Sequence, residues 1–266
     1  MSVFASADGA FVPTPDARGP WDPTALHGGA PAALIAAAFE RQAAADGLVP
    51  ARVGFEFLRP IPFAALELSH NVLRDGRRVR ELGAVLSANG QTVCRATALC
   101  VVPVPDGLPL GPEQLDPGPG MAGPDAGEPV LFTLDNTPDQ DSFGGSAMEM
   151  RWLGEPRTPG PARVWMRMRV PLLDGERASP LAVAAGAADF ANGVSRVLPF
   201  DEYLFINADL DLHVHRPPLG EWVGLDARTT LAAGGAGLTE TVLHDLSGPF
   251  GRSFQTLVVQ ARSDAR

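Results

Sequence analysis

The chain has 266 residues, of which 45% are hydrophobic and only 7% are aromatic, so Ala, Val and Leu must supply most of its core. Its formal net charge is -10, and all of its basic residues are arginines. This acidic balance argues against binding to nucleic acid or to an anionic membrane, because both attract basic surfaces. The N-terminus MSVFASADGAFVP has no signal-peptide pattern, and no apolar run is long enough to span a bilayer. We therefore expect a cytoplasmic protein.

The two cysteines, Cys94 and Cys100, lie in one apolar, strand-like segment. A strand holds residues at that spacing about 20 Å apart, which is too far for a disulfide. We expect free thiols in a reducing compartment.

The first hundred residues predict one helix followed by an antiparallel meander. The Ala-rich segment 25–45 follows Gly28 and Gly29, has Pro31 in its first turn and stops near Gly47. It is apolar nearly all round, which indicates a buried helix. Hairpin signals such as Asp-Gly and Asn-Gly separate the strand-like runs that follow. The predicted strands are 53–58, 66–73, 77–88 and 92–102.

Residues 103–130 are rich in Pro and Gly, which is typical of an irregular linker. After the linker the same order of elements returns. Ser179 and Pro180 open a second Ala-rich helix as N-cap and first-turn proline. The predicted strands of this half are 162–172, 203–215, 222–231, 238–244 and 252–261.

The shared order of elements is a weak internal repeat. In each half a strand ends in Arg-Pro, at Arg59 and at Arg216. The sequence therefore predicts an α+β fold made of an N-terminal unit at 1–102 and a C-terminal unit at 131–266. Each unit is a buried helix wrapped by an antiparallel sheet.

Several short motifs resemble acyl-CoA thioesterase II and its actinobacterial relatives. They are LHGG at 26–29, FLRP at 57–60, HRP at 215–217 followed by EW at 221–222, DART at 226–229 and GRSFQ at 251–255. The resemblance implies a double hotdog fold, in which two helix-wrapped antiparallel sheets are fused as a pseudo-dimer. It also implies hydrolysis of an acyl-CoA without metal or cofactor, and assembly into a homo-oligomer, a dimer of double hotdogs.

Carried over from that family, the catalytic residues fall on Asp209, on Thr229 or its neighbour Thr230, and on Gln255. Thioester hydrolysis needs an oriented water, a carboxylate that takes its proton and donors for the developing oxyanion. Asp209 would be that carboxylate, with Gln255 and Thr229 holding the same water.

The start of the first helix, at His27, Gly28 and Gly29, is expected to bind the thioester. Asp189 lies in the second Ala-rich helix and must be paired if it is buried. It is expected in the substrate-binding site together with His27, Gly28 and Gly29. It is also the alternative carboxylate, because some hotdog thioesterases place theirs on the central helix.

The internal repeat indicates a single site. Arg52 and Ala98 stand in the first half where Asp209 and Gln255 stand in the second. Neither can replace its counterpart, so a site at the junction would combine the glycine-bearing helix start of the first half with the polar residues of the second.

Three other interpretations stay open. One is a metal-dependent hydrolase, because the spacing along one predicted strand suits metal ligands at Asp209, Asp211, His213 and His215. Another is a hotdog hydratase, in which Asp209 and His213 would match the ends of an Asp-x-Asn-Pro-x-His signature. The Asn-Pro of that signature is missing between them, which argues against hydration chemistry. A hotdog protein that binds acyl-CoA without turning it over fits the same pattern.

Overall fold

The computed structural model describes residues 1–20, 22–104, 107–111, 118–131 and 141–262. Its N-terminal half contains one long helix and six strands within these residues. The helix is α1 (Gly29–Ala45), and the strands are β1 (Phe4–Ala7), β2 (Ala10–Pro13), β3 (Val49–Phe57), β4 (Leu66–Asp75), β5 (Val79–Ala88) and β6 (Gln91–Val101).

The C-terminal half repeats this order with a broken helix. Its helices are α2 (Pro180–Ala188) and α3 (Ala191–Val194). Its strands are β7 (Glu128–Val130), β8 (Met148–Leu153), β9 (Ala162–Met168), β10 (Tyr203–Asn207), β11 (Asp209–Val214), β12 (Val223–Leu231), β13 (Ala236–Asp245) and β14 (Gly248–Ala261). Among the described helices, none is both long and apolar enough to cross a membrane.

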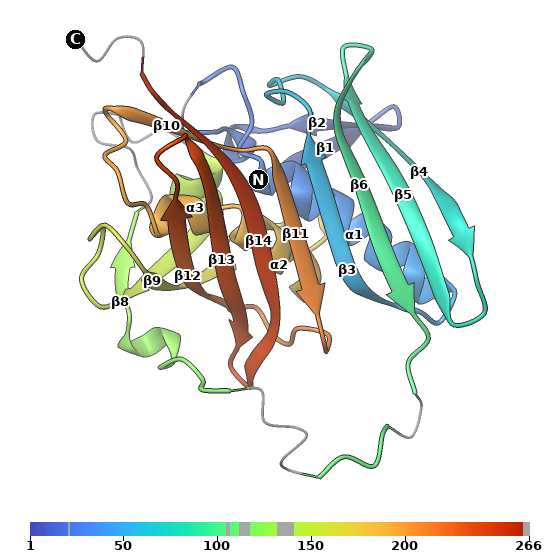
Figure 1. Ribbon diagram of the computed structural model, residues 1–266. Helices are drawn as coiled ribbons and strands as arrows, with labels where there is room; N and C mark the ends of the chain where they lie inside the picture. The colour runs from blue at the N-terminus through green and yellow to red at the C-terminus, as the bar shows by residue number, and fades with distance from the viewer. Residues whose placement is uncertain (21, 105–106, 112–117, 132–140, 263–266) are drawn as a thin grey trace.

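One continuous antiparallel sheet joins the two halves. Within the described residues fourteen strands take part, in the order β1-β2-β4-β5-β6-β3-β11-β14-β13-β12-β9-β8-β7, with β10 also pairing with β14. The seam lies between β3 and β11, where Asp211 pairs with Gly54 and Leu212 with Val53. Helices α1 and α2 lie together on one side of this curved sheet (Figure 1). The predicted architecture of two helix-wrapped antiparallel sheets is confirmed.

Helix α1 is held by its buried alanines and by a left-handed turn at its end. Gly47 has a φ of 68°, and its N–H bonds to the Ala44 carbonyl while the Leu48 N–H bonds to the Ala43 carbonyl. This pair of bonds is a Schellman motif, which satisfies carbonyls that the helix end leaves without partners. Residues along most of the helix are buried, as its all-round apolar sequence indicates.

Local irregularities account for the differences from the predicted elements. The predicted strand 203–215 is two strands, because Ala208 interrupts it and hydrogen-bonds to both Phe57 and Thr256. The second Ala-rich helix stops at Asp189 and resumes as α3. The sequence did not predict the hairpins β1–β2 and β7–β8, whose strands are short.

The segment predicted as an irregular linker, 103–130, is partly ordered against the sheet. Residues 105–106 and 112–117 lie outside the described residues. Glu128–Val130 forms β7 and pairs with β8, and the Ala122 carbonyl accepts a hydrogen bond of 2.6 Å from the indole of Trp165. The prediction that the linker is irregular and exposed along its whole length is therefore wrong for its last part, which is ordered against the sheet. The division into units at 1–102 and 131–266 stays a prediction, since one sheet spans both.

Arg216, from the HRP motif, anchors the segment after β11 to the β13–β14 hairpin. Its guanidinium binds the Asp245 carboxylate through two nitrogens and the Gly248 carbonyl at 2.9 Å. The Leu219 and Ser247 N–H groups also donate to Asp245, whose side chain is fully buried. Burial alone would raise the pKa of Asp245, but the hydrogen bonds and the charge of Arg216 outweigh it and lower the pKa.

We predict that Asp245→Asn lowers the free energy of unfolding by roughly 3 kcal/mol, because it leaves a largely buried guanidinium without its counter-charge. The folded-state pKa of Asp245 is lowered. Its stabilisation is therefore complete above the unfolded-state value of about 3.9 and is lost as the pH falls through the folded-state value. Urea denaturation of both proteins should show a gap at pH 7 that closes in acid.

The matched control is Asp226→Asn, since Asp226 pairs with Arg163 at an exposed position. We expect a loss of less than about 1 kcal/mol there. Equal losses in the two variants would contradict the anchoring role of Asp245.

Candidate active site

The site lies where the start of α1 meets the middle and end of α2. The two backbones touch at this crossing: a Cβ placed on Gly29 would lie only 2.5 Å from the Gly186 carbonyl oxygen. It would also lie 2.9 Å from the ring of Phe143, which is fully buried beside both helices. Glycine at position 29 is therefore what lets the helices approach this closely.

Asp189 caps the C-terminal end of α2 and directs its carboxylate to the start of α1. Its Oδ2 lies 2.9 Å from Nδ1 of His27, and its Oδ1 accepts a hydrogen bond of 2.8 Å from the Asn207 amide. The side chain is 5% exposed. A Cβ on Gly28 would lie 2.9 Å from Oδ2, so this glycine makes room for the carboxylate. The N-terminal end of a helix carries partial positive charge, which favours an anion here.

The His27 ring is fixed by packing as well as by polar contacts. It stacks on Phe190 with ring centroids 4.1 Å apart and leans on Phe143 at 5.3 Å. The Gly29 N–H donates to Nδ1 at 3.1 Å. When Nδ1 carries a proton it donates to Asp189 instead, because one ring nitrogen cannot accept and donate at once. The His27 ring and the Asp189 carboxylate therefore form a closely packed polar pair at a buried position.

Gln255 supports the helix break that presents Asp189. Its Oε1 accepts a hydrogen bond of 3.1 Å from the Asn192 N–H, and its Nε2 donates to the Asp189 carbonyl at 3.4 Å. The side chain is buried on β14, facing the helices. Both ends of the amide thus bind backbone groups that the interruption between α2 and α3 leaves without helical partners.

Thr229 belongs to a chain of buried hydroxyls that ties α3 to the sheet. Its Oγ1 lies 2.7 Å from the hydroxyls of Ser195 and Thr239, and Ser195 in turn donates to the Ala191 carbonyl at 2.8 Å. Thr229 is buried, whereas its neighbour Thr230 is exposed. Of the two threonines, Thr229 is the one that faces the helices.

Asp209 lies on the other face of the sheet. Its carboxylate accepts hydrogen bonds from the Thr256 N–H at 2.6 Å and from the Thr256 hydroxyl at 3.0 Å. Successive side chains on a strand point to opposite faces, so Thr256 and Gln255 diverge. The structure thus brings His27, Gly28, Gly29 and Asp189 together, with Gln255 and Thr229 bracing the same helix break, and leaves Asp209 apart from them.

Two other groups that could take part in catalysis, the Cys94 thiol and the strand of candidate metal ligands, lie in environments that do not favour such a role. Burial raises the pKa of the Cys94 thiol to about 12, and the charges of Glu56 and Asp189 add to the effect. A thiol with this pKa is protonated at neutral pH and is a poor nucleophile. On the strand that suited metal ligands, Asp211 pairs with Arg52. Across the described ranges, no three His, Cys, Asp or Glu side chains gather as a metal site would require.

Sequence reasoning missed three side chains of this site: Asn207, Phe143 and Phe190. Asn207 is the amide at the end of the largely apolar run YLFIN, which is a usable signal for a half-buried amide with a polar partner. Phe143 comes from a segment far along the chain from His27, and nothing in its local sequence indicates the contact.

Solved structures share this fold over nearly the whole chain. A candidate thioesterase from Novosphingobium aromaticivorans DSM 12444 is 24% identical with a TM-score of 0.69, covering 97% of this chain and 98% of its own. A protein with a hot dog fold from Alicyclobacillus acidocaldarius is 15% identical with a TM-score of 0.67 over 97% and 96%. Acyl-CoA thioesterase II TesB2 from Mycobacterium marinum is 16% identical with a TM-score of 0.63 over 91% and 92%. The fold is a double hotdog, as the sequence predicted.

Family models identify the sequence more narrowly. Residues 17–101 match the acyl-CoA thioesterase N-terminal domain, and residues 112–259 match the acyl-CoA thioesterase C-terminal domain. The chain belongs to the acyl-CoA thioesterase family and is a thioester hydrolase. A search of curated proteins finds no significant match.

We predict that Gly28→Ala reduces turnover by tenfold or more, because the added methyl group meets the Asp189 carboxylate at 2.9 Å and must displace it. The stability cost should be about 1–3 kcal/mol, as for an overpacked core position. Steady-state kinetics and thermal unfolding measure the two effects separately.

Gly234→Ala is the matched control, since a Cβ there meets nothing within 4 Å. It should behave as the wild type. Full activity in Gly28→Ala would show that the position of the Asp189 carboxylate does not matter for turnover.

Proposed function

We propose that the protein hydrolyses a fatty or related acyl-CoA to the free acid and CoA, with Asp189 as the base. Asp189 takes a proton from water as the water oxygen attacks the thioester carbonyl carbon. The tetrahedral intermediate then collapses, the carbon–sulfur bond breaks, and the CoA sulfur takes the proton that Asp189 held and leaves as the thiol. The observation that carries this proposal is the contact of 2.9 Å between the buried Asp189 carboxylate and His27 at the start of α1.

The surroundings of Asp189 suit a group that must hold a proton briefly. Protonated Asp189 can donate to Nδ1 of His27, and ionised Asp189 is held by the Asn207 amide. Efficient general-base catalysis needs the base fixed within hydrogen-bonding reach of its water. The lack of a side chain at Gly28 lets the carboxylate lie directly against the start of α1.

The start of α1 has a second role in this proposal. Negative charge develops on the thioester oxygen as water attacks, and the partial positive charge at a helix N-terminus stabilises it. The N-terminal half would thus supply the electrostatic stabilisation, while the C-terminal half supplies the base.

Gln255 and Thr229 are positioning residues in this proposal rather than ligands of the water. Their side chains are hydrogen-bonded to the helix break or to the hydroxyl chain that secures it. Asp209, the carboxylate indicated by the family resemblance, is the competing base.

Two substitutions separate the candidate bases. We expect Asp189→Asn to lower kcat at least a hundredfold, which is the usual contribution of a general base, because an amide cannot take the proton. Asp209→Asn should retain turnover within about threefold, since its carboxylate bonds to Thr256 on the outer face.

Release of free thiol from an acyl-CoA measures both rates, and unchanged thermal unfolding of both variants is the control. The opposite pattern, with Asp209→Asn inactive and Asp189→Asn active, would return the base to Asp209. A wild-type protein that binds acyl-CoA but releases no thiol would refute hydrolysis itself.

We also predict that a chelator leaves the activity unchanged. A thiolate is a good leaving group, so the mechanism needs neither a Lewis acid nor a metal-bound hydroxide. Turnover measured before and after dialysis against EDTA tests this. Activity that is lost in EDTA and restored by zinc would favour the metal-dependent alternative.

The cytoplasmic location and the dimer of double hotdogs stay predictions from the sequence.

A further inference from the structure

A cleft on the C-terminal half is lined by an unusual share of arginine. It has a volume of about 330 Å³ and lies where the end of β9 meets the residues before α2 and the segment before β12. Arg167, Arg169 and Arg177 line it, together with apolar side chains that include Val170, Pro171 and Val183.

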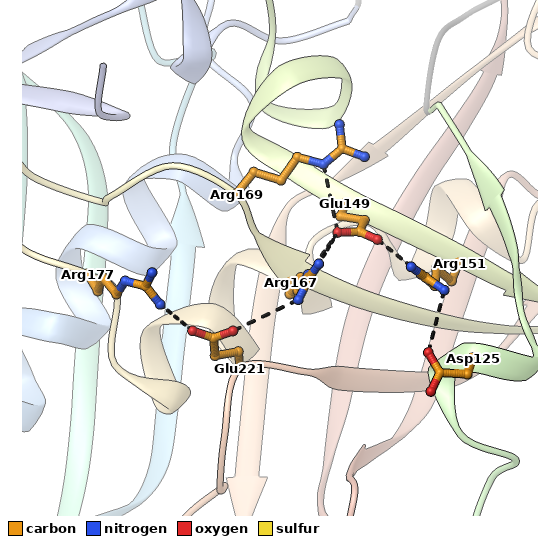
Figure 2. Close-up of polar contacts among 7 residues, drawn as sticks. All are labelled: Asp125, Glu149, Arg151, Arg167, Arg169, Arg177 and Glu221. Atoms are coloured by element: carbon orange, nitrogen blue, oxygen red, sulfur yellow. Dashed lines mark hydrogen bonds and ion pairs between the residues drawn. The ribbon is translucent and has the colours of Figure 1, made fainter.

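The cleft is positively charged, whereas the whole protein is negatively charged. Three arginines and one carboxylate, Glu221, line it, on a chain whose net charge is -10. Glu221 pairs with Arg177 and lies 4.0 Å from Arg167 (Figure 2). Arg177 is 84% exposed and Arg169 is 45% exposed, so both guanidinium groups are accessible to a ligand. A local concentration of positive charge on an acidic chain is the arrangement that attracts an anion.

A buried carboxylate, Glu149, fixes Arg167 and its neighbour Arg151 beside the cleft. Glu149 accepts hydrogen bonds from Arg167 at 2.8 Å and from Arg151 at 3.0 Å. Burial would raise the pKa of Glu149, but these hydrogen bonds and charges outweigh it and lower the pKa. The Arg167 guanidinium also lies 4.6 Å above the Trp222 ring.

Arg169 makes a weaker contact with this carboxylate than Arg167 does. Its Nε lies 4.0 Å from Glu149, and its terminal nitrogens point away from that group (Figure 2). Arg167 is therefore held in place by Glu149, while the terminal N–H groups of Arg169 are not engaged by that carboxylate.

Side chains that line the cleft pack against residues of the candidate active site across α2. Met168, which lines the cleft, lies 3.3 Å from the position that a Cβ on Gly186 would take, and Phe143 lies 3.2 Å from the same point. Phe143 packs on His27. Val183 lines the cleft, and Asp189 follows about 9 Å farther along the helix at a rise of 1.5 Å per residue.

We propose that this cleft binds the phosphate groups of coenzyme A, with Arg169 and Arg177 as the phosphate-binding residues. The inference rests on the proposed function, since it names where the CoA part of that substrate lies. Arginine matches phosphate oxygens with paired N–H donors. The N-terminal end of α2, which begins at Pro180 two residues after the cleft residue Ala178, adds its partial positive charge. The pantetheine arm separates phosphates from thioester, so it would run along α2 towards Asp189.

Two substrates that differ only in their phosphates test the cleft. One is an acyl-CoA and the other is the same acyl group on pantetheine, which carries no phosphate. Arg169→Gln and Arg177→Gln should each raise the KM for the acyl-CoA about fivefold or more, because each removes a charge-assisted hydrogen bond. The kcat, and both constants for the acyl-pantetheine, should stay as in the wild type.

Arg163→Gln is the control, since Arg163 is also exposed on β9 but pairs with Asp226 away from the cleft. It should leave the KM for both substrates unchanged. Titration calorimetry with CoA alone gives a readout that does not depend on turnover, and both cleft variants should bind CoA more weakly by a similar factor. Because Arg177 is 84% exposed, its substitution should not disturb folding.

The two proposals fail separately. An equal rise in KM for both substrates, an unchanged KM for acyl-CoA or equal CoA binding by variants and wild type would overturn the cleft while leaving hydrolysis in place. A wild type that does not bind CoA would also overturn it. Weakened CoA binding in the variants of a protein that cleaves no thioester would support the cleft and refute the hydrolysis.

Discussion

The crossing of α1 and α2 is the contact on which the arrangement of the site depends. At Gly29 and Gly186 the two backbones touch, and a methyl group at position 29 would force them apart. This approach brings the positive end of one helix to the carboxylate at the end of the other. A side chain from a third segment, Phe143, packs beside the same contact. The pairing of Asp189 with His27 is thus a consequence of helix packing, and it needs residues from both halves.

Most of the fold could be predicted from the sequence, because its elements are locally encoded. The Ala-rich helices, the prolines and glycines at their ends and the turn dipeptides between strands can each be recognised from the local sequence. The short strands β1, β2 and β7 carry none, since a few residues hold no periodic pattern and pair only because a neighbouring strand is present. The break at Ala208 is equally invisible, because hydrogen bonds to two other strands produce it.

The candidate site was predictable in part. The glycines and His27 at the start of α1 stand out as a motif, and a buried Asp189 calls for a partner. That these two meet could not be predicted from either segment alone, because the contact depends on how the helices cross. The family resemblance selected Asp209 by its place before HRP. The face of the sheet that a side chain occupies depends on register, and β11 pairs so that Asp209 bonds to Thr256.

The seam between β3 and β11 has a consequence for how the protein could diversify. Two separate copies of a single unit, meeting through the same strand pairing, would carry every substitution twice and present two identical sites. In the fused chain a substitution alters one half only. Position 52 could therefore become an arginine, which pairs across the seam with Asp211, while the other half keeps its own residues. Covalent linkage thus releases the two halves from symmetry, and each is free to specialise in one part of the chemistry.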